Sequence, residues 1–156
     1  MWLADLGNGN YRNPILYADY SDPDAIRVGE DYFMVASSFS NSPALPILHS
    51  KDLVNWKVVN YCLKHIPEFR YNNPLHGCGV WAPSIRYHEG TYYVCFPMPD
   101  EGIYMTTTKD PFGEWSEPVN IRPGAGWIDP SGMMTVMLIL WQVLQRAELD
   151  IRVFFI

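Results

Sequence analysis

The sequence predicts an all-β fold made of repeated units, each with about four short strands. The first observation is that a short motif containing proline recurs three times, within residues 18–29, 81–87 and 127–131. In the first two places an Ile-Arg pair and an aromatic, β-branched run follow it. The second observation is the spacing, because Lys51 and Trp56 are matched by Lys109 and Trp115 at offsets of about 58 to 59 residues, a period typical of solenoids and propellers. We therefore expect two similar units and the opening of a third.

Each unit contains the signals of two hairpins. In the first unit, Gly29 and two acidic residues separate a short strand from the run 32–37, and the polar residues 50–55 separate two further apolar segments. In the second unit, turn residues occur at 87–90 and 98–102. Between the units, residues 67–79 are rich in Pro, Asn and Gly, and we expect a long loop there, of the kind that carries function.

Composition excludes several classes of function. A net charge of −6 disfavours binding to nucleic acid or to an anionic membrane, because both require a basic surface. The three cysteines, Cys62, Cys78 and Cys95, lack C-x-x-C spacing, so we expect buried free thiols and no metal site. The sequence indicates no cofactor. The segment after Met1 has neither a basic nor an apolar stretch typical of a signal peptide, so we expect a cytoplasmic chain.

Six segments, in order, resemble the N-terminal part of glycoside hydrolase family 43. They are residues 13–16 (NPIL), 21–23 (SDP), 37–39 (SSF), 49–56 (HSKDLVNW), 79–87 (GVWAPSIRY) and 127–130 (WIDP). The resemblance implies a five-bladed β-propeller of exo-acting β-xylosidases, α-L-arabinofuranosidases and arabinanases, with the active site in the central channel. It covers residues 13–130, about the first half of such a domain. We expect blades over residues 18–62 and 80–120 and the start of a third at 127–130.

Residues 131–156 do not fit this pattern, so the partial propeller domain is assigned to residues 1–130. The apolar run 132–144 is too short to span a bilayer, which needs about 20 residues. Codons permitted for residues 132–138, read one nucleotide out of frame, encode Trp-Asp-Asp-Asp-Gly-Asn-Ala, which is similar to the next strand of the family. We therefore interpret the tail as foreign to the fold, produced by a frameshift near Ser131; a buried helix is the alternative.

The resemblance assigns roles to two carboxylates. Glycoside hydrolysis with inversion needs two carboxyl groups about 6.5 to 9.5 Å apart, so that a water molecule fits beside the sugar. Asp22 matches the general base of the family, and Asp129 matches the acid that orients the proton donor and keeps it protonated. Apart from the resemblance, each is interpreted as a turn residue before proline. The proton donor itself, a Glu of a later blade, has no counterpart in this chain.

Three further residues are candidate ligands of an oligosaccharide substrate. Phe39 and Trp81 are expected to form aromatic walls for a pentose ring, with core packing as the alternative. His76, in the long loop, is a candidate hydrogen-bonding partner of a sugar hydroxyl, with a solvated loop histidine as the alternative. Asp19 and Asp24 are interpreted either as acids that support the site residues or as surface acids, and the Asp100-Glu101 pair is interpreted as a solvated turn.

These assignments predict that the parent enzyme removes terminal pentoses from xylan- or arabinan-derived chains by an inverting mechanism. This chain, which lacks the general acid, is expected to be inactive alone. A non-catalytic carbohydrate-binding propeller fragment is the alternative from another class. An invertase-like hydrolase is disfavoured because its Asn-Asp-Pro-Asn start is absent. An unclosed propeller leaves sheet edges open, so we also expect self-association.

Overall fold

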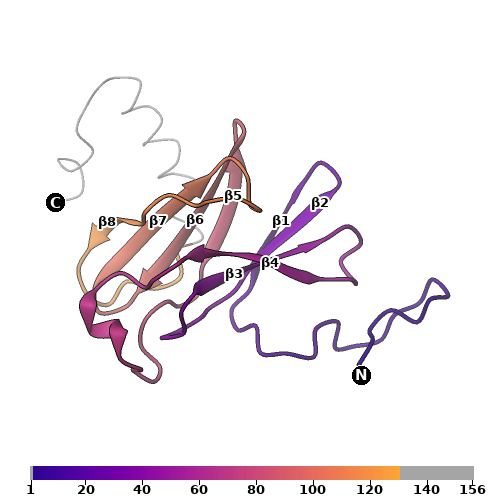
Figure 1. Ribbon diagram of the computed structural model, residues 1–156, viewed down its shortest axis with the longest axis horizontal. Helices are drawn as coiled ribbons and strands as arrows, with labels where there is room; N and C mark the ends of the chain where they lie inside the picture. The colour runs from indigo at the N-terminus through magenta and orange to yellow at the C-terminus, as the bar shows by residue number, and fades with distance from the viewer. Residues whose placement is uncertain (1, 131–156) are drawn as a thin grey trace.

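Two four-stranded antiparallel sheets form the part of the chain that the computed structural model describes, residues 2–130 (Figure 1). The first sheet consists of β1 (Asp24–Val28), β2 (Asp31–Val35), β3 (Ala44–Ser50) and β4 (Lys57–Leu63). The second consists of β5 (Ser84–His88), β6 (Thr91–Met98), β7 (Gly102–Thr108) and β8 (Val119–Pro123). In both, neighbouring strands follow the order of the chain. The predicted pair of four-stranded units is confirmed, and the second continues past residue 120.

Tight turns fix the inner hairpins, and irregularities twist the outer ones. Glu89 and Gly90, between β5 and β6, both have positive φ angles of 44° and 79°, as a two-residue type I′ turn requires. The pairing of β3 with β4 shifts register after Ile47, and that of β7 with β8 shifts after Ile103. Because such bulges increase local twist, each sheet acquires the twisted form of a propeller blade.

The main hydrophobic core lies between the two sheets. Strand β6 shows the alternation that produces it, since Val94 and Phe96 face this core while Tyr93 and Cys95 face a smaller cluster on the other side. The shared core combines residues of both sheets and of the connection between them, including Phe33, Val35, Leu45, Ile47, Leu63, Ile66, Val80, Ile85, Met98 and Tyr104. The two sheets are therefore packed as neighbouring blades.

The connection between the sheets runs from the end of β4 to the start of β5 and contains one short 3-10 helix, η1 (Phe69–Asn72). This is the long loop that the sequence predicts. The connection leads into the start of β5. Because β5 and β6 are antiparallel, this start lies at the same edge of the second sheet as the end of β6. In Figure 1, η1 lies beside the start of β7 and the end of β8.

Asp24, the first residue of β1, joins the two sheets at their inner strands. Its Oδ2 accepts hydrogen bonds from Ser84 Oγ (2.9 Å), the Ile85 backbone N–H (2.9 Å) and Arg86 Nη1 (2.6 Å). Ser84 and Ile85 are fully buried. Of the two interpretations of Asp24, a supporting acid or a surface acid, these bonds favour a supporting one, because Asp24 connects the two blades.

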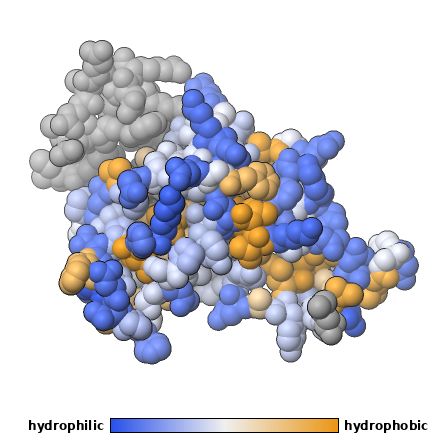
Figure 2. All heavy atoms as spheres, in the orientation of Figure 1, coloured by the Kyte–Doolittle hydropathy of each residue, from blue (hydrophilic) through white to orange (hydrophobic). Residues whose placement is uncertain are grey.

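The surface of the described residues is hydrophilic with interspersed apolar patches (Figure 2). Exposed apolar side chains occur on both outer strands, Val58 and Tyr61 on β4 and Val119 on β8. No helix within residues 2–130 is long and apolar enough to cross a membrane. The predicted aberrant tail, residues 131–156, and the frameshift near Ser131 lie outside the described residues.

Candidate active site

Asp22 lies in the segment that leads into β1, and its side chain is exposed. Its φ angle of 48° is in the left-handed region, which Asp enters more readily than most residues. Its carboxylate Oδ2 accepts hydrogen bonds from Ser21 Oγ (2.7 Å) and Ser37 Oγ (2.9 Å). The Ser37 backbone N–H also donates to the Ser21 carbonyl at 3.0 Å. The carboxylate is therefore held in one orientation by the end of β2.

Phe39 follows β2 and is locked against the start of the second blade. Its N–H donates to the Val80 carbonyl (2.8 Å), and the Val80 N–H donates to the Phe39 carbonyl (3.0 Å). Gly79 allows this approach, because a Cβ atom there would lie 2.3 Å from the Phe39 carbonyl oxygen, and its φ angle is +94°. The half-buried Phe39 ring is thus carried by a loop that the neighbouring blade fixes.

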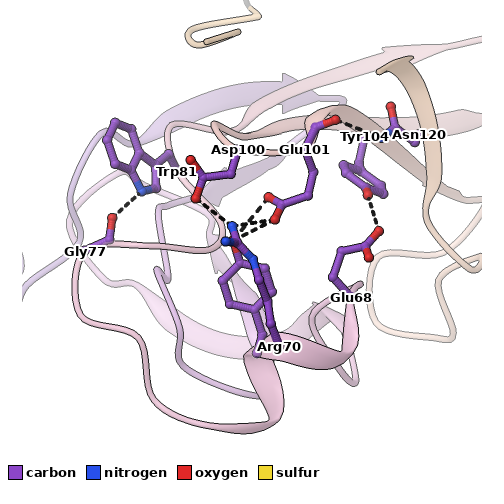
Figure 3. Close-up of polar contacts among 9 residues, drawn as sticks. Glu68, Arg70, Gly77, Trp81, Asp100, Glu101, Tyr104 and Asn120 are labelled. Carbon is purple, nitrogen blue, oxygen red and sulfur yellow. Dashed lines mark hydrogen bonds and ion pairs between the residues drawn. The ribbon is translucent and has the colours of Figure 1, made fainter. Parts of the chain in front are cut away.

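Trp81, directly after Val80, is half-buried and anchored at two points. Its indole Nε1 donates to the Gly77 carbonyl at 2.9 Å (Figure 3), and its backbone N–H donates to the Pro97 carbonyl at 3.0 Å. His76 is the exposed neighbour of Gly77. The indole and the His76 loop therefore hold each other in place.

Asp129 lies in the loop that follows β8. Like Asp22 it is exposed and has a left-handed backbone, with a φ angle of 50°. The loop is fixed to the turn between β6 and β7, because Gly126 N–H donates to the Pro99 carbonyl (2.7 Å) and Gly124 N–H to the Glu101 carbonyl (3.0 Å). Trp127, two residues ahead, packs against the cluster on the far face of β6, which agrees with a packing role.

Four of the five predicted site residues lie in segments that hydrogen bonds connect, although no hydrogen bond joins two of the four directly. Asp22 bonds to Ser37, two residues before Phe39, and Phe39 bonds to Val80, which precedes Trp81. The Trp81 indole bonds to Gly77, which follows His76. Asp129 forms no hydrogen bond or ion pair with these four within residues 2–130. Its loop approaches theirs at the end of β6, where Trp81 bonds to Pro97 of the strand and Gly126 bonds to Pro99 of the turn that follows.

Comparison with known proteins identifies the relatives of this arrangement. The model of the glycosyl hydrolases family 43 matches residues 11–143. The chain belongs to this family. A non-reducing end alpha-L-arabinofuranosidase of Bacteroides ovatus is 42% identical over 142 residues, which are 84% of this chain and 26% of that protein. A beta-xylosidase of Formosa agariphila is 40% identical over 131 residues, covering 81% of this chain and 22% of that protein.

Solved structures of family 43 give the same result. A Bacteroides ovatus GH43B structure from a xyloglucan utilisation locus superposes with a TM-score of 0.64 at 43% identity, covering 77% of this chain and 24% of that one. The Bacillus licheniformis GH43 protein BlXynB superposes with a TM-score of 0.65 at 36% identity, covering 78% and 26%. The chain thus spans about a quarter of the length of its relatives. Family 43 folds as a five-bladed β-propeller, and each four-stranded sheet here is one blade.

An ion-pair cluster at the same end of the second blade was missed by sequence analysis. Arg70 of η1 lies between Asp100 and Glu101 of the β6–β7 turn, with Nη2 at 2.6 Å from Asp100 Oδ2 and 2.5 Å from Glu101 Oε1 (Figure 3). The hydrogen bond that Arg70 donates to Asp100 raises the pKa of Arg70 further above its usual range. The interpretation of Asp100-Glu101 as a solvated turn is wrong in this respect, because its carboxylates hold the long loop against the blade.

Glu101 and the nearby Glu68 also accept hydrogen bonds from tyrosine hydroxyl groups. Tyr71 Oη donates to Glu101 at 3.1 Å, and Tyr104 Oη donates to Glu68 at 3.0 Å. Burial, the largest cause, raises the pKa of Tyr104 to about 12, so the phenol keeps its proton and acts as a donor. Glu101 is therefore held at both oxygens by Arg70 and Tyr71, and Glu68 is held at Oε1 by Tyr104. Within residues 2–130, no group of three or more His, Cys, Asp or Glu side chains could hold a metal ion.

Proposed function

We propose that residues 11–130 supply the first two blades, and the start of the third, of an exo-acting glycosidase. The enzyme would remove terminal pentoses from xylan- or arabinan-derived oligosaccharides with inversion. The observation that carries this proposal is the Asp22 carboxylate, held by two hydroxyl groups next to the linked Phe39 and Trp81, in a family 43 chain. The names of the relatives, an arabinofuranosidase and a β-xylosidase, support pentosides as the substrate class.

In this mechanism Asp22 is the general base and takes a proton from the attacking water. An inverting enzyme separates its two carboxyl groups by about 6.5 to 9.5 Å to leave room for that water. Phe39 and Trp81 pack against the C–H faces of the pentose, and His76 hydrogen-bonds to a hydroxyl group. Asp129 lies near the proton donor of a later blade, where its negative charge orients the donor and favours the protonated form.

The 156-residue chain is proposed to have no measurable turnover by itself. General acid catalysis contributes about 10²- to 10⁴-fold, which corresponds to roughly 3 to 5 kcal/mol of barrier. The later blades also bury the sugar and orient the water, so that contribution is missing too. We propose in addition that a one-nucleotide change of frame near Ser131 separates this chain from those blades; resequencing the DNA around codon 131 tests this.

A chimera tests the catalytic role directly. Residues 11–130 would replace the aligned segment of the Bacteroides ovatus relative, which is 42% identical and supplies the other blades. We expect the chimera to hydrolyse nitrophenyl pentosides and Asp22→Asn to abolish that activity. Asp19→Asn is the matched control, because Asp19 is an exposed acid of the same segment with no side-chain partner within residues 2–130. A folded Asp22→Asn chimera that retains activity would refute the role of Asp22.

A non-catalytic carbohydrate-binding fragment is the second candidate function. The observation in its favour is that Phe39 and Trp81 are fixed by contacts within blades 1 and 2, so the aromatic walls need no later blade. Titration of the 156-residue chain with xylobiose, monitored by tryptophan fluorescence, tests it, with Trp81→Ala as the control. Binding that depends on Trp81, combined with an inactive chimera, would favour the binder over the enzyme.

A further inference from the structure

The two oxygens of the Asp22 carboxylate have different surroundings. Oδ2 accepts both hydroxyl hydrogen bonds, from Ser21 Oγ at 2.7 Å and from Ser37 Oγ at 2.9 Å. No described residue donates a hydrogen bond to Oδ1. A serine hydroxyl carries a single proton, so each serine spends its one donor on the same oxygen. The lone pairs of Oδ1 are therefore available to a ligand, while Oδ2 is committed to the protein.

Ser37 is the better placed of the two anchors. It is 8% exposed, lies two residues after β2, and its backbone N–H is bonded to the Ser21 carbonyl, so the backbone that carries its hydroxyl is tied to the Asp22 turn. It also precedes, by two residues, the Phe39 backbone that is bonded to Val80. One short segment thus sets the position of the proposed base relative to the proposed aromatic wall.

We propose that Ser37 is a positioning residue that, together with Ser21, fixes Asp22 Oδ2 so that Oδ1 receives the proton of the attacking water. This inference rests on the proposed function of Asp22. In the step, one O–H bond of water breaks and its proton goes to Oδ1, while the water oxygen bonds to the anomeric carbon. The glycosidic C–O bond breaks, and its electron pair stays on the leaving oxygen, which the donor of a later blade protonates. Rotation of the carboxylate would turn Oδ2, which already accepts two hydrogen bonds, towards the water and slow the step.

The anchoring itself can be tested on the 156-residue chain without any activity. Magic-angle-spinning ¹³C NMR of aspartate-labelled protein does not require a monomer, and loss of a signal in Asp22→Asn assigns the Asp22 carboxyl resonance. We expect Ser37→Ala to move and broaden this resonance and Ser37→Thr, which keeps the hydroxyl, to restore it. Ser50→Ala is the matched control, because buried Ser50 donates to Asp52 Oδ1 at 3.0 Å and should affect Asp52 alone.

A second variant covers the case in which Ser37→Ala fails to fold. Ser21→Ala removes the other hydroxyl bond to the same oxygen from a partly exposed position and should move the same resonance. An Asp22 resonance that is unchanged in folded Ser37→Ala and in Ser21→Ala would overturn the anchoring.

The functional consequence is tested in the five-bladed chimera. The free energy of a hydrogen bond to a charged group corresponds to about a factor of ten or more in a rate constant. We therefore expect Ser37→Ala to lower kcat roughly tenfold with KM nearly unchanged, and Ser37→Thr to restore kcat. Equal kcat values for the chimera and its folded Ser37→Ala variant would overturn the positioning role. Failure of the proposed function would be distinguishable, because Asp22→Asn would then leave activity intact.

Discussion

Asp24 offers the sharpest test of how the two blades are held together. The change is Asp24→Ala, which removes the acceptor of three hydrogen bonds from Ser84, Ile85 and Arg86. The Ser84 hydroxyl and the Ile85 N–H belong to residues with no exposed surface, so loss of the carboxylate leaves both donors without their protein acceptor at a largely buried position. The Arg86 side chain is 32% exposed and that of Asp24 is 30% exposed, so solvent partly screens the ion pair between them.

These surroundings set the expected loss of stability. A buried donor left without an acceptor costs about 1 to 3 kcal/mol, and a partly exposed ion pair contributes roughly 0 to 1 kcal/mol. The hydroxyl of Ser84 can rotate, so the Ile85 N–H carries most of the cost. We expect Asp24→Ala to lower the free energy of unfolding by about 1 to 4 kcal/mol, against the roughly 5 to 15 kcal/mol typical of a domain. Asp24→Asn keeps one acceptor oxygen and should lose about half as much.

Urea denaturation followed by tryptophan fluorescence, at one low protein concentration, measures this loss. Asp19→Ala is the control, since Asp19 is an exposed acid without a side-chain partner within residues 2–130. The midpoint should fall in the order Asp19→Ala, Asp24→Asn, Asp24→Ala. Equal midpoints for Asp19→Ala and Asp24→Ala would refute the bridge between the blades as a source of stability.

Three further outcomes are expected. Gly79→Ala should disrupt the blade contact, because its Cβ would overlap the Phe39 carbonyl, whereas Gly77→Ala, with a φ of +72° but open space, should cost only about 1 to 2 kcal/mol; similar urea midpoints would contradict this. Hydrogen bonds from Lys51 and then His49 lower the pKa of Asp31, and those from Asn55 and Val54 lower that of Asp52. A carboxyl group whose pKa is lowered in the folded state stabilises the fold at pH values above its unfolded pKa, near 4. That contribution decreases as the pH falls from the unfolded pKa towards the folded one. Asp52→Asn should therefore lose less stability between pH 5 and pH 3 than the unmodified chain. The 156-residue chain should be oligomeric in light scattering, and a monomer with a cooperative melt would count against open sheet edges.

The strands could be predicted because their signals are local. The turn at residues 87–90 and the aromatic, β-branched run after it are visible in neighbouring residues, and the structure has the Glu89-Gly90 turn and strand β6 there. The contacts between blades could not be predicted in this way. Asp24 bonds to Ser84 sixty residues away, and Arg70 pairs with Asp100 thirty residues away, so neither acid has a local sequence signal of its partner. The neighbouring residues of each acid therefore do not predict these contacts.

The candidate site shows the same division. Asp22, Phe39, Trp81 and Asp129 follow from the family resemblance, whereas the serine hydroxyls that hold Asp22 do not. Serine is common in turns and at strand ends, and its role here depends on the end of β2 returning beside the segment before β1. That proximity is a property of the sheet and not of either segment alone.

The contacts that orient Asp22 and those that hold the loop of Asp129 lie within the first two blades. Asp22 is held by Ser21 and Ser37, and the loop of Asp129 is held by the turn between β6 and β7. Under the proposed function, the later blades supply the proton donor and bury the sugar, whereas these bonds do not depend on them. The chimera is therefore a fair test, because it adds the proposed donor without altering the bonds that orient Asp22. If the base is correctly placed, restoring the later blades should be sufficient to restore catalysis.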